Sequence, residues 1–69
     1  MLAQMEFSKE ELILLRRALI RETDRLSELV QFCEESGDEI GARACKNSYY
    51  RCTGISARIR RVIMDIDGV

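Results

Sequence analysis

A regular apolar repeat in the second half of the chain is the feature that most constrains its fold. Small or branched residues recur there in alternating steps of three and four, which is the spacing of one face of a helix. The repeat consists of Cys45, Ser48, Cys52, Ile55, Ile59, Val62 and Ile66. Between Ile40 and Met64 there are six Arg or Lys residues and no Asp or Glu. We therefore predict one long amphipathic helix over about residues 38–66, with most of its positive charge away from the apolar side.

A signal for the start of another helix lies near the beginning of the chain. Ser8 can accept a hydrogen bond from the Glu11 amide while the Glu11 side chain reaches back to the Ser8 amide, an arrangement called a capping box. Phe7 and Leu12 occupy the two positions of a hydrophobic staple around this box. We predict a helix over about residues 8–35. Its inner stripe consists of Leu12, Leu15, Leu19, Leu26, Leu29 or Val30, and Cys33, with Glu22 interrupting it.

A Ser-Gly-Asp-Glu segment at 36–39 separates the two predicted helices. Gly37 suits the left-handed conformation that often follows a helix end, and Asp38 or Ser36 can cap the next helix. Because so few residues connect the helices, they must run antiparallel. Residues 1–69 are therefore expected to form a single all-α domain, an antiparallel two-helix hairpin. The expected neighbours across the hairpin include Leu15 with Ile59 and Leu19 with Ile55.

Further apolar residues of the first helix fall outside its inner stripe. At about 100° per residue, Leu14 and Phe32 project to one side, and Ile13 and Ile20 to the other. A single partner helix cannot cover this much apolar surface. A chain of 69 residues is also marginally stable on its own. We therefore predict that the hairpin self-associates, most simply into a dimeric four-helix bundle, or into a higher helical oligomer.

Composition and cysteine usage exclude several classes of protein. Hydrophobic residues make up 46% of the chain and charged residues 33%, which is too apolar for a disordered chain. The chain starts without the features of a secretory signal, and its longest apolar run, Leu12 to Leu15, is too short to span a membrane. Three cysteines, an odd number without CxxC spacing, indicate reduced thiols. We expect a cytoplasmic protein that does not enter a membrane.

Charge is distributed unevenly although its formal net value is only -1. Ten of the twelve acids lie between Glu6 and Glu39, and the basic residues of the second helix follow them. Acids of the first helix could pair with bases of the second, or the surface could be polarised toward an anionic partner. The outer face of the second helix carries the candidate ligand-binding residues Arg43, Lys46, Tyr50, Gly54, Arg58 and Arg61. This face could be simply solvated, could pack closely against another helix, or could hold a nucleotide or nucleic acid.

The sequence gives little support for catalysis or metal binding. It has no His, and no Ser, Cys or Lys with an evident activating partner. Cys45 and Cys52 are two helical turns apart, and no fourth ligand completes a zinc site. Cys33 could approach Cys45 near the turn and form a disulfide on oxidation. We therefore expect no enzyme activity, no cofactor and no metal.

The leading functional prediction is a non-enzymatic helical binding module that acts as a regulator, adaptor or inhibitor through protein–protein contact. Its interface residues would be Ile13, Leu14, Ile20 and Phe32, and its partners would be a second copy of itself and another protein. The alternative is an oligomeric anion-binding protein that holds a nucleotide or nucleic acid on the basic face of the second helix. No motif in the chain identifies a family.

Overall fold

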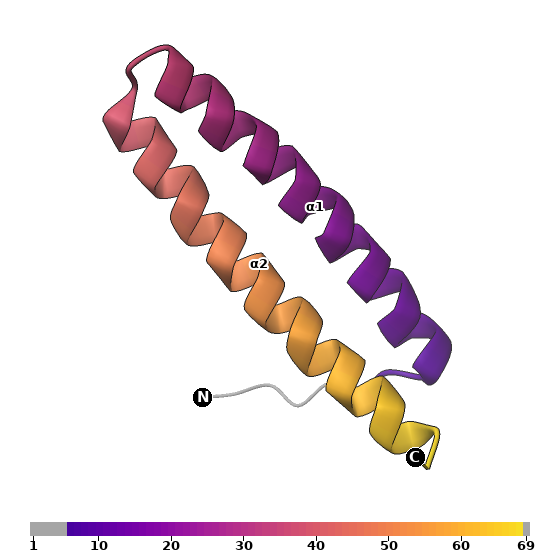
Figure 1. Cartoon of the computed structure of the whole chain (residues 1–69). Coiled ribbons are helices and arrows are strands. Elements are labelled where there is room, and N and C mark those ends of the chain that lie inside the picture. Colours follow the sequence, from indigo (N-terminus) through magenta and orange to yellow (C-terminus); the bar gives the residue numbers. More distant parts are fainter. Residues whose placement is uncertain (1–5, 69) are drawn as a thin grey trace.

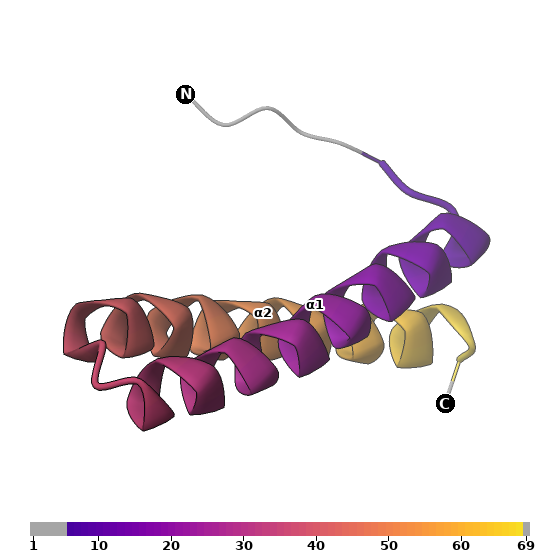
Figure 2. The same cartoon turned by 90° about the horizontal axis from the view of Figure 1, so that it is seen from above.

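The protein is an antiparallel pair of helices in a computed structural model that describes residues 6–68. Helix α1 spans Lys9–Glu35 and α2 spans Glu39–Ile66, and the part described contains no strand. Figure 1 shows the two helices side by side, joined by a tight turn at one end. The view from above in Figure 2 shows α1 crossing over α2. The predicted all-α hairpin is confirmed, and its self-association stays a prediction.

The start of α1 follows from the capping box predicted above. The Glu11 amide donates to Ser8 Oγ at 3.2 Å, and the Ser8 amide donates to Glu11 Oε1 at 2.8 Å. Both bonds satisfy backbone donors that have no partner inside the helix. Acidic side chains in the first turn, those of Glu10 and Glu11, also suit the positive end of the helix dipole.

The turn between the helices is built on Gly37, whose φ is +78°. Its amide donates to the Glu34 carbonyl at 3.2 Å, and the Asp38 amide donates to the Cys33 carbonyl at 2.8 Å. These two bonds form a Schellman motif, which requires a left-handed residue at the glycine position. The Asp38 carboxylate then accepts from the Gly41 amide at 2.9 Å and caps α2. The prediction of a cap at Asp38 or Ser36 is resolved in favour of Asp38.

The core between the helices is thin. Only Leu12, Leu26 and Ala42 are buried among the described residues, and none of them is completely enclosed. The Cα radius of gyration is 15.0 Å, whereas a compact domain of this length has about 11 Å. A hairpin of two long helices has little interior, so most of its apolar side chains stay in contact with water.

The face of α2 that packs on α1 differs from the predicted repeat. Cys45, Cys52 and Ile59 lie on it as predicted, but the positions between them are rotated by one residue. The packed face contains Ala42, Cys45, Tyr49, Cys52, Ser56, Ile59 and Ile63, all buried or half-buried. The predicted members Ser48, Ile55, Val62 and Ile66 are exposed instead. Ser56 faces α1 in place of Ile55, so Ile55 lies exposed at the edge of the contact.

Ion pairs neutralise few of the basic residues of α2. Lys46 pairs with Glu34 at 3.0 Å, the arrangement expected if acids of the first helix meet bases of the second. The only other ion pair across the hairpin in the described part joins Lys9 of α1 to Asp67, the residue that follows α2, with the opposite polarity. No carboxylate of residues 6–68 lies within 4.0 Å of the remaining basic groups of α2. The arginines of α2 therefore form no ion pair with the described residues.

Candidate functional site

An apolar groove runs along one flank of the hairpin. It has a volume of about 650 Å³. We call it the apolar groove and define it by its lining residues, Phe7, Leu12, Leu15, Ala18, Leu19, Glu22, Ile55 and Ile59. The predicted neighbours Leu15 with Ile59 and Leu19 with Ile55 line it together, which agrees with the predicted register. Leu15 and Ile55 are 39% and 43% exposed, so the groove presents apolar side chains to solvent.

The single acid in this groove, Glu22, is already paired. Arg25 Nε donates to Glu22 Oε1 at 2.7 Å, and Arg25 Nη2 donates to Oε2 at 2.6 Å. This two-bond geometry is the strongest form of a carboxylate–guanidinium contact. The hydrogen bonds from Arg25 lower the pKa of Glu22 below its ordinary value, while partial burial opposes them. The carboxylate that interrupts the apolar stripe is thus compensated within its own helix.

A second depression, of about 670 Å³, lies on the other flank. We call it the arginine cavity. Its lining residues are Arg16, Ile20, Thr23 and Asp24 from α1, with Thr53, Ser56, Ala57, Arg60, Arg61 and Met64 from α2. Consecutive residues, which lie 100° apart around a helix, fall on different flanks. Leu15 and Ile59 line the groove, whereas the next residue of each helix, Arg16 and Arg60, lines the cavity. The hairpin therefore has one apolar flank and one flank where guanidinium groups gather.

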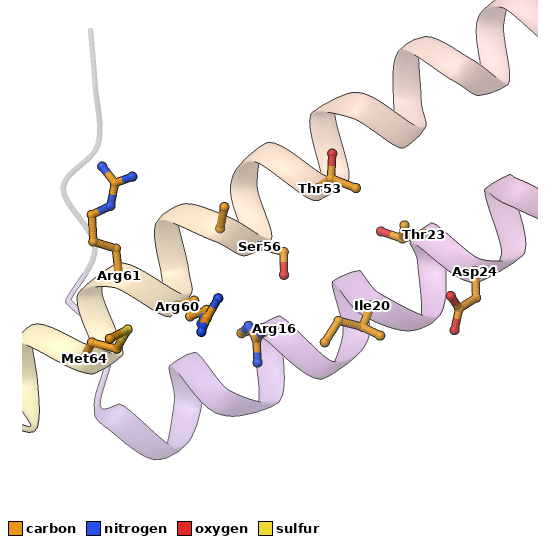
Figure 3. Close-up of a pocket in the computed structure, with 10 residues that line it drawn as sticks. Arg16, Ile20, Thr23, Asp24, Thr53, Ser56, Arg60, Arg61 and Met64 are labelled. Atoms are coloured by element: carbon orange, nitrogen blue, oxygen red, sulfur yellow. The ribbon is translucent and has the colours of Figure 1, made fainter.

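Arg16 and Arg60 point toward each other across the gap between α1 and α2 in Figure 3. The Nε of Arg16 is buried and has no hydrogen-bond acceptor among the described residues. Ser56 directs its hydroxyl toward α1, whereas the Asp24 carboxylate points away from α2 (Figure 3). Arg61 extends away from α1 at the rim (Figure 3). The guanidinium groups of Arg16 and Arg60 thus converge in the arginine cavity, and the carboxylate of Asp24 does not face them.

The candidate ligand-binding residues of α2 do not form one site. All six are exposed. Arg43 and Lys46 line a depression beside the turn, whereas Arg61 lines the arginine cavity at the far end of the helix. Lys46 and Tyr50 share a third, smaller depression of about 190 Å³. Gly54 and Arg58 line none of these depressions. The basic face is therefore an extended exposed strip.

The predicted interface residues lie on two sides of α1. Leu14 and Phe32 are 63% and 67% exposed, and their separation of 18 residues is five helical turns, which places them on the same side. Ile20 is exposed and lines the arginine cavity. Ile13 is half-buried and lines an adjoining depression that also contains Arg16, Arg17 and Arg60.

Arg16 and Arg60 were not predicted as site residues from the sequence, although the predicted register of the two helices implies that they lie on the same flank. Leu15 and Ile59 were predicted neighbours, and Arg16 and Arg60 each follow one of them. Because the helices run in opposite directions, one residue step on each turns both side chains toward the same flank. The charge pattern of the sequence placed the candidate binding residues on α2 alone, whereas the arginine cavity contains one of these two arginines from each helix.

The three thiols are free and half-buried. Burial raises the pKa of the Cys33 thiol, and the charge of Asp38 and the nearby Cys45 thiol raise it further. This supports the expected proximity of Cys33 to Cys45. No group of three His, Cys, Asp or Glu side chains suited to a metal ion occurs in residues 6–68.

No protein-family model matches the chain, and no curated protein or solved structure is significantly similar to it. Neither α1 nor α2 contains a stretch long and apolar enough to cross a membrane.

Proposed function

We propose that the protein is a non-enzymatic helical binding module that works as a homo-oligomer, most simply a dimeric antiparallel four-helix bundle. The observation that carries the proposal is the apolar groove together with its exposed neighbours. Val62 and Ile66 of α2 are 46% and 50% exposed and belong to the same predicted repeat as Ile55. Regular apolar residues that a hairpin leaves uncovered are typical of a helix-bundle interface.

The extent of the exposed surface supports a second copy as the occupant of the groove. The exposed surface measures 5925 Å², about a third more than the ~4,450 Å² typical of a monomeric protein of 8.0 kDa. A stable dimer covers about 800 Å² on each partner. Burying the groove and the adjoining residues Val62 and Ile66 against a second hairpin would add the interior that two helices alone lack.

Electrostatics also favour this occupant. A second apolar groove brings no charge of its own except another Glu22–Arg25 pair. Because each Glu22 carboxylate already accepts two hydrogen bonds from Arg25, covering it does not leave an unpaired buried charge. The pair lies at one place along the groove and can fix the register of the two copies.

A protein partner would bind elsewhere on the assembled particle. Leu14 and Phe32 lie on one side of α1 and line none of the depressions described above. Their exposure leaves two apolar anchors about 27 Å apart for a regulatory, adaptor or inhibitory contact. Binding through them should survive high salt and fall in Phe32→Ala, measured with the purified partner after its identification.

The association is tested by sedimentation equilibrium at micromolar concentration. We expect the wild-type chain to sediment as a dimer or larger particle, and Ile55→Lys to shift it toward the monomer. Ile40→Lys is the matched control, because Ile40 is 84% exposed near the turn and lies outside the groove. Circular dichroism verifies that each variant keeps its helices. A wild-type chain that sediments as an 8.0 kDa monomer throughout this range would contradict the proposal.

A nucleotide or nucleic acid on the basic face of α2 is the second candidate function. The exposure of all six residues favours it, and a Cβ at Gly54 would meet nothing within 4 Å, so the hairpin leaves this face open. Salt-sensitive binding that falls in Arg43→Ala or Arg58→Ala would support it. Calorimetry without heat for any nucleotide or oligonucleotide would remove it.

A further inference from the structure

We infer that the arginine cavity is a binding site for a small phosphate ester, with Arg16 of α1 and Arg60 of α2 as the two groups that hold the phosphate. This inference does not depend on self-association through the apolar groove, which lies on the opposite flank. It also differs from binding on the outer face of α2, because one of its two principal residues belongs to α1.

Positive charge converges at the arginine cavity. Arg16 and Arg60 come from different helices and point toward one another at the same depression (Figure 3). No carboxylate of residues 6–68 lies within 4.0 Å of either guanidinium group, since the ion pairs of that part use Lys9, Arg25 and Lys46. Two like charges held together repel each other, and an anion between them would turn that repulsion into attraction.

Arg16 also carries an unused hydrogen-bond donor. Arg16 Nε is buried and has no hydrogen-bond partner in the described part of the chain. A buried charged donor without an acceptor is unfavourable, and a bound anion would supply the missing acceptor. Arginine also presents its N–H groups in a planar fork that matches two oxygens of a phosphate.

The hydroxyl groups and walls of the cavity define the rest of the ligand. Ser56 directs its hydroxyl into the gap and makes no hydrogen bond to another described residue, so it can donate to a phosphate oxygen (Figure 3). The Thr23 and Thr53 hydroxyls already donate to the carbonyls of Leu19 and Tyr50. Ile20 and Met64 supply apolar wall beside the arginines.

The size of the cavity favours an ester over a bare ion. A volume of about 670 Å³ exceeds the needs of inorganic phosphate and falls within the range of small-molecule sites. The apolar side chains can contact the organic part of the molecule while the guanidinium groups hold the phosphate. An extended nucleic acid would instead require a continuous basic track, and Asp24 at the rim of the cavity interrupts one.

The test is isothermal titration calorimetry of the full chain with adenosine 5′-monophosphate and, separately, with inorganic phosphate. Arg16→Gln and Arg60→Gln should each weaken binding at least about tenfold, the loss expected for one charged hydrogen-bonding group. Arg51→Gln is the matched control, because Arg51 is an exposed arginine of α2 that lies outside the cavity and outside the candidate ligand-binding residues. Its affinity should stay within about twofold of wild type, since its charge lies in solvent.

The affinities of the two probes and the variants distinguish a phosphate-ester site from a diffuse basic surface. Tighter binding of the ester than of inorganic phosphate supports the full inference, and equal affinities with the same variant pattern support an anion site that reads the phosphate alone. Equal weakening by Arg51→Gln and Arg60→Gln would show a diffuse basic surface and overturn it, as would the absence of heat with both probes at millimolar concentration. Sedimentation of Arg16→Gln and Arg60→Gln reports self-association separately and should match wild type.

Discussion

Glu22 and Arg25 form a two-bond ion pair within α1, at the edge of the apolar groove. The bonds measure 2.7 Å and 2.6 Å, and both oxygens of the carboxylate are used. Glu22 is the residue that interrupts the apolar stripe of α1, and a lone carboxylate there would oppose burial of the groove. Its pairing allows the apolar flank to act as one continuous surface.

This pair makes the stability of the protein depend on pH in acid. Hydrogen bonds from Arg25 hold the pKa of Glu22 below its ordinary value of 4.5, so the unfolded chain takes up this proton at higher pH than the folded chain. The stabilisation is therefore present above pH 4.5 and is lost as the pH falls through the folded pKa. Glu22→Gln should lower the free energy of unfolding at pH 7 and flatten its decline below pH 4.5.

Urea unfolding at fixed protein concentration, at pH values from 7 to 3, measures this dependence. Glu28→Gln is the control, because Glu28 takes part in none of the ion pairs of the described residues. Loss of the same acid-dependent component in Glu28→Gln, or its retention in Glu22→Gln, would refute the role of the pair.

Two glycines should respond in opposite directions to alanine. Gly37 has a φ of +78°, which alanine adopts only with strain, so Gly37→Ala should destabilise the hairpin by about 1 kcal/mol. Gly54 lies inside α2 with open space around its added Cβ, so Gly54→Ala should stabilise the protein by about 0.5–1 kcal/mol. Thermal and urea unfolding give both values. A gain at Gly37 would mean that the turn differs from the one described.

Cys33 should be a slow nucleophile in the folded protein. Burial, the Asp38 charge and the Cys45 thiol all raise the pKa of its thiol, so less thiolate is present at pH 8 than in the unfolded chain. Alkylation by iodoacetamide, followed by peptide mass spectrometry, should be slower in buffer than in urea. Asp38→Asn keeps a good helix cap but removes the charge, so Cys33 should react faster in that variant. Equal rates in buffer and urea would rule out this environment.

Local signals predicted the secondary structure well because they act within a few residues. The capping box of Ser8 with Glu11 and the left-handed Gly37 depend on the adjoining backbone alone, and both occur as expected. The antiparallel arrangement followed from the shortness of the turn, and the register followed from the turn and the apolar spacing. Leu15 and Ile59 line the apolar groove together, in agreement with that register.

Rotation of α2 about its own axis was not available from the same signals. The apolar repeat marks a broad stripe, and either edge of it can face α1. Packing brought Ala42, Ser56 and Ile63 inward and left Ile55, Val62 and Ile66 exposed, which created the apolar groove. The candidate interface and ligand residues taken from the sequence remain predictions.

The sequence by itself determined two amphipathic helices, their boundaries, the turn and the antiparallel register, because caps, glycine conformation and periodicity are local properties of the chain. Only the tertiary structure decided which edge of each stripe is covered and that Arg16 and Arg60 meet across the gap. Those outcomes depend on how closely two helices approach and how each is rotated toward the other. Both are set by side-chain packing between the two helices, which brings together residues as far apart in the sequence as Arg16 and Arg60.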